Sequence, residues 1–219
     1  PDVLPTGTGR DCAFDPTGTY LAVTHTSPYI TIYKRSGDTF TKLADPDVFP
    51  TSTGNGCAFD PTGTYLAVTH VSVPRITIYK RNGDTFTKLA NPDVRPTGDG
   101  HGCAFDPTGT YLAVAHQNSP YITIYKRSGD TFTKLANPDV LPTGTGRDCA
   151  FDPTGTYLAV THQNSPYITI YDVFSRAVFQ TGNSIIDIQE DGVIAAGYAR
   201  EDGLAGETKE IVRIWRVGG

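Results

Sequence analysis

The sequence has no methionine, a single tryptophan and no long apolar run. A membrane-spanning helix needs about 20 consecutive apolar residues, so we expect no membrane insertion. The chain also lacks a Cys-x-x-Cys pair, a G-x-S-x-G elbow and the D-x-D-x-D-G loop that binds calcium. Its net charge of -5 comes from mixed acidic and basic residues, which leave no basic footprint for nucleic acid. We therefore expect no metal, no cofactor and no nucleic-acid partner.

What the sequence has in abundance is repetition. The segment CAFDPTGTYLAVTH starts at Cys12 and recurs at Cys57 and Cys149, and CAFDPTGTYLAVAH starts at Cys103. The repeats are therefore 45 or 46 residues apart. A period of this length with several strand signals in each unit is typical of a propeller blade.

Each repeat contains four segments with the composition of a β-strand. In the first repeat they are Asp11–Asp15, Tyr20–His25, Tyr29–Arg35 and Thr39–Leu43, and we name these positions strands A to D. The glycines of PTGT and SGD allow tight turns between A and B and between C and D. After Tyr171 the repeat decays, but SIIDIQEDG, VIAAGY and EIVRIWRV keep the pattern of strands A, B and C. We predict an all-β propeller of five blades in one domain, 1–219, with units at about 9–45, 54–91, 100–137, 146–182 and 183–219, the fifth divergent and lacking strand D.

The segment AFDPTGTYLAV resembles the strand–turn–strand of WD40-type propellers, and ITIYD and VRIWR resemble their strand C signature. The units are most similar to the YLAVAH…PYITIYKRSGDTFTKL repeats of phage and prophage tail-associated proteins and bacterial surface proteins. The chain lacks the GH dipeptide and most of the Trp and Asp residues of the WD40 hydrogen-bond tetrad. The resemblance therefore implies the fold, and it implies a virion or cell-surface assembly made in the cytoplasm.

All four cysteines occupy one position of the repeat. Equivalent atoms of neighbouring units lie farther apart than the ~7 Å between Cα atoms that a disulfide tolerates. We therefore expect four buried, reduced thiols; a shared metal site would require them to converge on the axis.

The repeats differ mainly in two connections, D–A and B–C, which emerge on one face because strands alternate in direction. Loops on a rigid scaffold are where binding usually resides, so we expect this face to hold the ligand site; the alternative is that longer loops drift because nothing packs on them. The candidate residues are Arg10, Asp11, Phe49, Asn55, Arg95, Asp99, His101, Arg147 and Asp148.

One histidine ends strand B of each repeat. Strands lie ~4.8 Å apart, so this ring of imidazoles is too wide for a single metal ion, and we expect each one to donate a hydrogen bond to a loop carbonyl. The alternative is a repeated ligand pocket between blades, formed with the tyrosines that begin strand C. Its residues are His25, His70, His116, His162, Tyr29, Tyr121 and Tyr167.

Three functions fit this pattern. The first is a non-catalytic binding or structural module, part of a larger assembly, whose D–A/B–C face contacts a receptor or partner protein. The second is a lectin-like propeller that binds cell-surface glycans at repeated sites between blades, with avidity from multivalency. The third is a hydrolase of the lactonase or phytase type, which needs convergent carboxylates where the repeats offer only Asp11 and Asp148. We rank them in that order and expect that the chain is not an enzyme.

The chain ends predict an incomplete closing blade. The first residues, PDVLP, match the residues after strand D in the other units, so we expect the natural chain to continue upstream. The ring then closes by packing of the fifth blade on the first through Ile186, Ile188, Ile194 and Ile214. The alternatives are a fragment of a larger ring, or a ring that two chains complete.

Overall fold

The computed structural model describes residues 1–173, 178–181, 184–187 and 216–217, with side chains for residues 1–173. These residues contain β-strands and no helix, and therefore no helix that could span a bilayer. They form four antiparallel sheets of four strands and one sheet of two strands. This is an all-β propeller, consistent with five blades of which the last is truncated.

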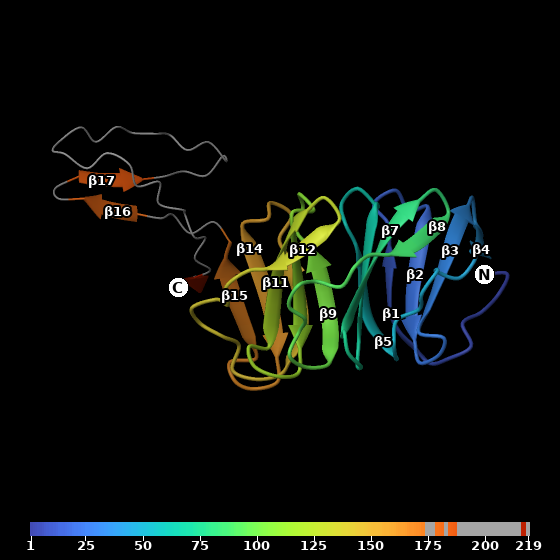
Figure 1. Cartoon of the computed structure of the whole chain (residues 1–219), viewed down its shortest axis with the longest axis horizontal. Coiled ribbons are helices and arrows are strands. Elements are labelled where there is room, and N and C mark those ends of the chain that lie inside the picture. Colours follow the sequence, from blue (N-terminus) through green and yellow to red (C-terminus); the bar gives the residue numbers. More distant parts are fainter. Residues whose placement is uncertain (174–177, 182–183, 188–215, 218–219) are drawn as a thin grey trace.

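The four large sheets are the blades predicted from the repeats (Figure 1). Blade 1 contains β1 (Gly9–Phe14), β2 (Tyr20–His25), β3 (Ile30–Ser36) and β4 (Thr39–Lys42). Blade 2 contains β5 (Gly54–Phe59), β6 (Tyr65–His70), β7 (Ile76–Asn82) and β8 (Thr85–Lys88). Blade 3 contains β9 (Gly100–Phe105), β10 (Tyr111–His116), β11 (Ile122–Ser128) and β12 (Thr131–Lys134). Blade 4 contains β13 (Gly146–Phe151), β14 (Tyr157–His162), β15 (Ile168–Asp172) and β18 (Arg216–Val217).

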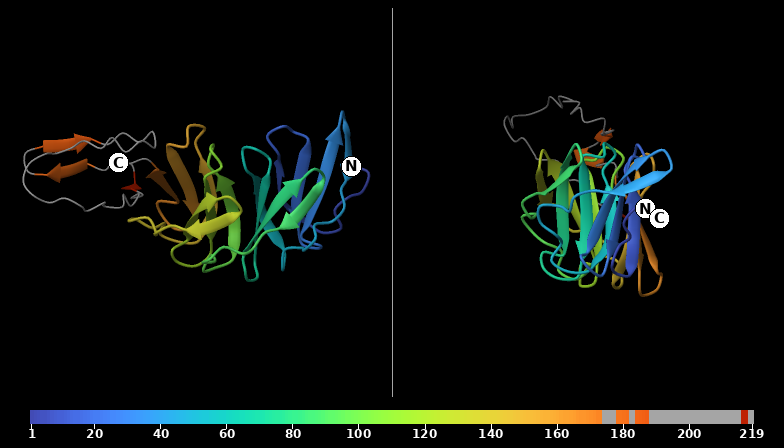
Figure 2. Two further views of the ribbon diagram at one scale, coloured as in Figure 1. Left: turned by 45° about the horizontal axis from the view of Figure 1, so that its top comes forward. Right: turned by 90° about the vertical axis from the view of Figure 1, so that its right-hand side faces the viewer.

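The blades stand face to face in a curved row, with blade 1 and blade 4 at its two ends (Figures 1 and 2). Strand A of each blade contacts strand A of the next, so β1, β5, β9 and β13 form one continuous inner wall. The D–A and B–C connections meet at one end of the blades, as expected. At this end Thr51 donates to the carbonyl of Val73, and Thr97 donates to the carbonyl of Ser119.

Hydrophobic contacts between blades hold the row together. Between blades 2 and 3, Tyr65, Ile76 and Ile78 of one sheet pack against Leu112 and Phe132 of the next. The same set recurs between blades 1 and 2, and it recurs between blades 3 and 4 without an equivalent of Phe132 among the described residues. Both faces of a blade are apolar. A blade therefore needs a neighbouring blade on each side to remove these faces from water.

The connection that leads into each blade also fastens that blade's outer edge. The Asp47 carboxylate accepts a hydrogen bond from the backbone N–H of Lys88 at 2.8 Å, and the Tyr79 hydroxyl donates to the carbonyl of Val48 at 2.8 Å. Asp2 makes the equivalent contact with Lys42 in blade 1. The first residues of the chain therefore line blade 1 and do not supply a strand to a fifth blade.

The strands after Tyr171 differ from the expected arrangement. β16 (Val178–Thr181) pairs with β17 (Ser184–Asp187) and not with β15. The outer position of blade 4 is taken by β18, in which Val217 lies opposite Tyr171. The prediction that Arg216 belongs to strand C of a fifth blade is therefore wrong, because that residue completes the sheet of the fourth.

The predicted closure on blade 1 is not observed in the described residues. Ile186 lies opposite Phe179 in the β16–β17 pair, while Ile188, Ile194 and Ile214 lie outside the described residues. The face of blade 1 that would receive them is exposed, with Phe14 51% accessible.

The cysteines are free, and three of them are buried between blades, as expected. Cys12 is the exception, because it lies on the first face of the row and no preceding blade covers it. The prediction that all four thiols are buried is therefore wrong for Cys12. Burial raises the pKa of the thiols of Cys57 and Cys103, which keeps them in the unreactive protonated form.

Thiol titration with a chromogenic disulfide reagent tests this arrangement. We expect at most one thiol to react rapidly in the native protein, and all four to react after unfolding, because three lie between packed sheets. Cys12→Ser is the control and should remove any rapid phase. Two or more rapid thiols in the native wild-type chain would contradict the stacking of the blades.

Candidate functional site

A polar groove runs along the inner wall of the row, close to the first residues of the inner strands, which directly follow the D–A connections. It has a volume of about 350 Å³ and combines residues from all four inner strands: Arg10, Asp11, Asn55, Gly56, His101, Gly102, Arg147 and Asp148. Each blade contributes two consecutive residues, at the second and third positions of its inner strand, β1, β5, β9 or β13. Six of the nine residues that the sequence singled out on this face therefore lie around one cavity.

The two ends of the groove carry both signs of charge, whereas its middle is uncharged. Arg10 and Asp11 lie at one end, and Arg147 and Asp148 lie at the other. Burial lowers the pKa of His101, and the nearby Arg147 guanidinium adds to this effect, so the imidazole is neutral at pH 7. Loss of water around its carboxyl raises the pKa of Asp148, with a further contribution from the negative charge of Asp11.

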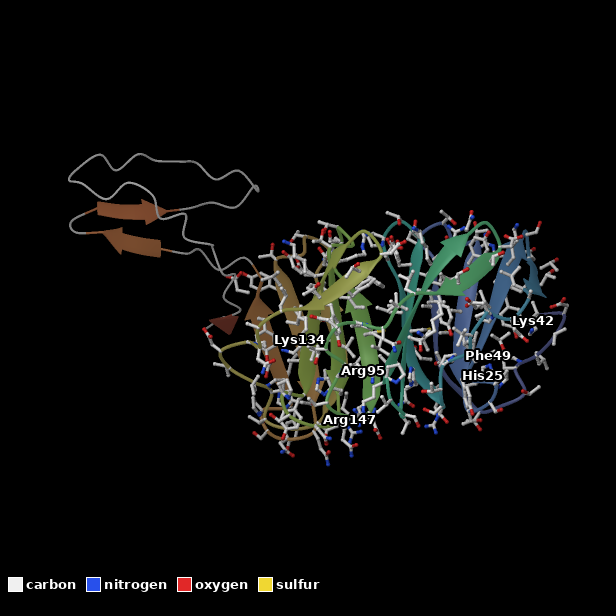
Figure 3. All side chains as sticks on the ribbon, viewed as in Figure 1. His25, Lys42, Phe49, Arg95, Lys134 and Arg147 are labelled. Carbon is white, nitrogen blue, oxygen red and sulfur yellow. The ribbon has the colours of Figure 1, made fainter. Side chains whose placement is uncertain are left out.

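Hydrogen bonds fix several of the groove side chains. The Asp11 carboxylate accepts from the backbone N–H of Cys12 at 2.8 Å and from that of Cys57 in the next blade at 3.0 Å. The amide of Asn55 donates to the carbonyl of Gly100 at 2.7 Å. Arg147 contacts Gln163 at 3.3 Å and otherwise projects at the lower rim of the blades (Figure 3). The floor of the groove is thus rigid, while the arginines at its ends are exposed.

The sequence did not single out Gly56 and Gly102 as site residues, although the repeats place Asp at the same position in blades 1 and 4. A Cβ atom on Gly102 would lie 2.8 Å from the Cα atom of Asp148. A Cβ atom on Gly56 would likewise meet the carbonyl of His101. The two glycines therefore let neighbouring inner strands approach closely and keep the middle of the groove open.

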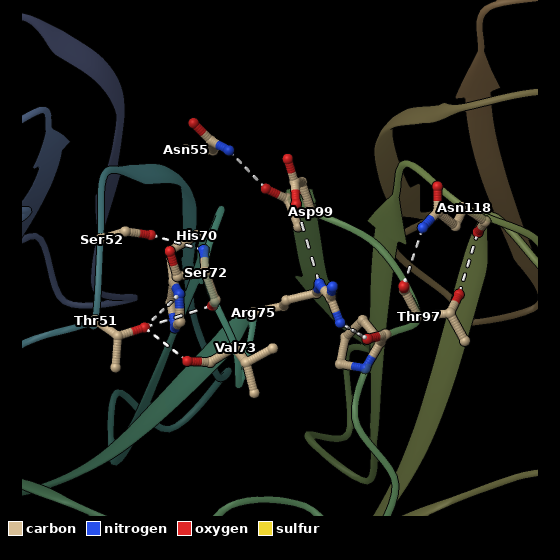
Figure 4. A network of polar contacts seen from close by, with 12 residues as sticks. Thr51, Ser52, Asn55, His70, Ser72, Val73, Arg75, Thr97, Asp99 and Asn118 are labelled. Atoms are coloured by element: carbon tan, nitrogen blue, oxygen red, sulfur yellow. Dashed lines mark hydrogen bonds and ion pairs between the residues drawn. The ribbon is translucent and has the colours of Figure 1, made fainter.

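Three predicted residues lie outside the groove. Phe49 is half-buried and packs against the core between blades 1 and 2. Arg95 is exposed on the D–A connection. Asp99 lies 4.0 Å from the guanidinium of Arg75, which also donates to the carbonyl of Pro96 (Figure 4). Arg75 thereby links a B–C loop to a D–A connection. In the sequence, this link is indicated by the replacement of tyrosine by arginine at this position of the second repeat.

The histidines that end strand B are buried structural residues. Each one shares a hydrogen bond of 2.8–3.0 Å through Nε2 with the threonine of strand C: Thr31, Thr77, Thr123 and Thr169. The Nδ1 atom of His25 donates to the carbonyl of Ser27 at 2.9 Å, as predicted, but the prediction does not hold for the other three. The Nδ1 atoms of His70 and His162 contact the hydroxyls of Thr51 and Thr143, and that of His116 has no hydrogen-bond partner among the described residues. The imidazoles are buried, whereas Tyr167 at the start of strand C is 63% exposed.

No three His, Cys, Asp or Glu side chains within residues 1–173 come together in an arrangement that could hold a metal ion. The aspartates of the DPTG turns are used locally instead. Asp15 accepts from the backbone N–H of Tyr20 at 2.7 Å and from the hydroxyl of Thr17 at 2.7 Å.

Comparison with known proteins bears on the fold. No protein-family model matches the sequence, and no curated protein matches it. Among solved structures, the chain is similar to hydrazine synthase from Kuenenia stuttgartiensis, with a TM-score of 0.60 and 15% identity over 78% of this chain and 48% of the other. It is similar to a putative 6-phosphogluconolactonase from Bacteroides fragilis, with a TM-score of 0.63 and 16% identity over 84% and 54%. It is also similar to a chain of a nidogen/laminin complex, with a TM-score of 0.57 and 19% identity over 77% and 62%.

At these identities the likeness shows a β-propeller-like fold of repeated four-stranded blades and nothing more. The chain spans about half the length of the first solved structures that it matches. Because two of the three similar structures bear the names of enzymes, the expectation that this chain is not an enzyme has to be corrected: the fold gives no ground for excluding catalysis.

Proposed function

We propose that this chain is a binding module whose inner groove receives one asymmetric segment of a partner protein. The observation that supports it is the convergence of Arg10, Asn55, His101 and Arg147, which are equivalent positions of near-identical repeats, around one cavity. Packing does not require these four to differ, because the two arginines are exposed and the other two are only half-buried.

The difference between equivalent positions favours a single ligand over repeated sites. A lectin-like propeller would present the same groups in every blade, whereas the groove presents an Arg–Asp pair in blades 1 and 4, Asn55 and Gly56 in blade 2, and His101 and Gly102 in blade 3. The histidines proposed for repeated glycan pockets are buried, with at most 4% of their surface exposed. A polypeptide segment with an anionic and a cationic group at each end and a polar middle complements the groove, and an arginine binds a carboxylate through two parallel hydrogen bonds.

The place of action belongs to the same proposal. The similarity of the units to repeats of phage tail-associated and bacterial surface proteins supports a role on a virion or cell-surface assembly. In such an assembly the partner is a structural protein or a receptor of the host surface.

Selection from a displayed library of random linear peptides tests the proposal, with the enriched peptide as the probe. We expect Arg10→Ala and Arg147→Ala each to weaken its binding about 10- to 100-fold, because a hydrogen bond to a charged group contributes about 1.5–3 kcal/mol. Arg95→Ala is the matched control, since it removes an exposed arginine of the same face outside the groove. The assignment would be refuted if Arg95→Ala abolished binding or if both groove variants still bound the peptide. It would also be refuted if a glycan array gave ligands and the peptide library gave none.

A further inference from the structure

Among the described residues, nothing covers the last face of the row, which is a copy of a buried interface. Tyr20, Tyr65 and Tyr111 are 4–6% exposed where the next blade covers them, whereas the equivalent Tyr157 is 47% exposed. Ile168 and Ile170 are 45% and 43% exposed, whereas the equivalent isoleucines of blades 1–3 are at most 3% exposed. Tyr157 and Ile170, with Phe151 and Ala159, line an apolar hollow of about 510 Å³ on blade 4.

The first face of the row is the complementary half of the same interface. Between blades, the cysteine of strand A lies against the preceding sheet; the Cys57 sulfur, for example, contacts the carbonyl of Ala22 at 3.8 Å. On blade 1 the equivalent Cys12 is exposed, together with Phe14. The sequence of this face is almost the same as that of blades 2, 3 and 4.

Gly9 adds an independent indication. The equivalent glycines Gly54, Gly100 and Gly146 each lie against the carbonyl of a B–C loop in the preceding blade; a Cβ atom on Gly100 would lie 2.5 Å from the Arg75 oxygen. A Cβ atom on Gly9 would have no heavy atom within 4 Å. The separate chain has no steric need for glycine at this position, but a blade packed in front of it would.

We propose that two copies of this chain join head to tail, with blade 4 of each copy packed on blade 1 of the other, and close a ring that includes the four four-stranded blades of each copy. The chain already makes this contact three times with nearly identical residues. The exposed face of blade 4 and the exposed face of blade 1 are therefore complementary in shape and polarity. In the ring, the carbonyl of Tyr167 in one copy lies against Gly9 of the other, as the Arg75 carbonyl lies against Gly100 within the chain.

One position distinguishes the contact between copies from those within the chain. Tyr20 and Lys34 both bind Asp84 of the next blade, with distances of 2.6 and 2.9 Å, and Tyr65 and Lys80 bind Asp130 in the same way. In the contact between copies the acceptor is Asp38 and the tyrosine donor is Tyr157. The residue opposite Tyr157 in β15 is Asp172, so a second carboxylate replaces the lysine that blades 1 and 2 have at this position. The contact between copies is therefore weaker than those within the chain.

A head-to-tail contact either closes into a ring or continues into a filament. The curvature of the row in Figure 2 brings the inner strands to one side, which favours closure. Eight blades fall within the usual range for propellers. The part of this chain that matches hydrazine synthase and 6-phosphogluconolactonase covers only 48% and 54% of those chains, so this chain alone accounts for about half of each.

Sedimentation velocity of the full chain over a range of concentrations tests the proposal. We expect a species with twice the 23.6 kDa mass of one chain, in a fraction that rises with concentration. Gly9→Val should sediment as a single chain with an unchanged circular dichroism spectrum, because valine fits a strand and meets nothing within the chain. Thr87→Val is the control; it places valine on an exposed position of β8, away from both end faces, and should still form the double-mass species.

Two further readouts come from the same contacts. Asp172→Lys should shift assembly to several-fold lower concentration, because it restores the pair that Lys34 makes with Asp84. The Cys12 thiol should react rapidly in Gly9→Val and slowly in the assembled wild type. A wild type that stays at one-chain mass, with Cys12 either reactive or covered by its own chain, would overturn the proposal. Open-ended oligomers, or a Gly9→Val variant that assembles like the wild type, would overturn it as well. None of these outcomes depends on the peptide that the groove binds.

Discussion

Replacing Ile122 with alanine is expected to lower the free energy of unfolding by ~2–5 kcal/mol, since truncation of a fully buried isoleucine loses its transfer free energy and leaves a cavity. Ile122 has no exposed surface, because blade 4 covers it completely. Ile168 occupies the same position of its sheet, opposite Thr161 where Ile122 lies opposite Ala115, but it is 45% exposed at the end of the row. The same substitution there should cost about 1 kcal/mol or less.

Urea unfolding, followed by circular dichroism at a concentration where copies of the chain stay apart, measures both values. The comparison isolates the neighbouring blade, because the two residues differ in little else. Equal losses for Ile122→Ala and Ile168→Ala would contradict the conclusion that packing between blades, and not the individual sheet, stabilises the fold.

The free energy of unfolding is expected to fall as the pH is lowered from about 6.5 to about 4. Burial lowers the pKa of His70 and of His116 from 6.5 to about 4 in the folded chain. Above pH 6.5 both imidazoles are neutral whether the chain is folded or unfolded, so they contribute no pH dependence. Below it, the unfolded chain takes up protons that the folded chain does not accept until about pH 4. Each imidazole therefore costs roughly 3 kcal/mol of stability by that pH.

His70→Gln identifies the contribution of one imidazole. Urea titrations at several pH values should show a shallower decline for this variant than for the wild type, by one proton. The Asp148 carboxyl, whose raised pKa acts in the opposite direction, is the same in both proteins and cancels in the comparison. A stability that is flat between pH 7 and 4.5, or a variant whose slope equals that of the wild type, would show that the imidazoles are not buried in neutral form.

The blades and their order were predictable because each unit carries both the strand pattern and the turn chemistry of the others. Asp15 and Gly18, which the sequence assigned to a turn, hold that turn by hydrogen bonds and a positive φ of 67°. The end of the row was not predictable. Cys12 has the same sequence neighbours as the buried Cys149, and it is exposed because no blade of the described residues packs in front of it. Likewise, nothing in the identity of Arg216 and Val217 shows that they pair with β15.

The groove was predictable in part. The differences between repeats identified Arg10, Asn55, His101 and Arg147, because sequence variation among copies of one unit marks positions that the common fold does not determine. They did not separate Phe49, which packs into the core, from the residues that line the cavity. The alternation of strand A predicts that truncation of Phe59 or Phe105 costs ~3–5 kcal/mol. In the structure both are only half-buried, whereas Phe86 and Phe132 of strand D are 2% exposed.

The central claim is that side chains from equivalent positions of the four blades form one binding groove. Amide chemical-shift mapping of the isotope-labelled protein tests it most directly, with the library-selected peptide as the ligand. We expect the largest shifts at residues 10–11, 55–56, 101–102 and 147–148, which line the groove. Shifts confined to the A–B turns around Gly18, Gly63, Gly109 and Gly155, at the opposite end of the blades, would contradict it.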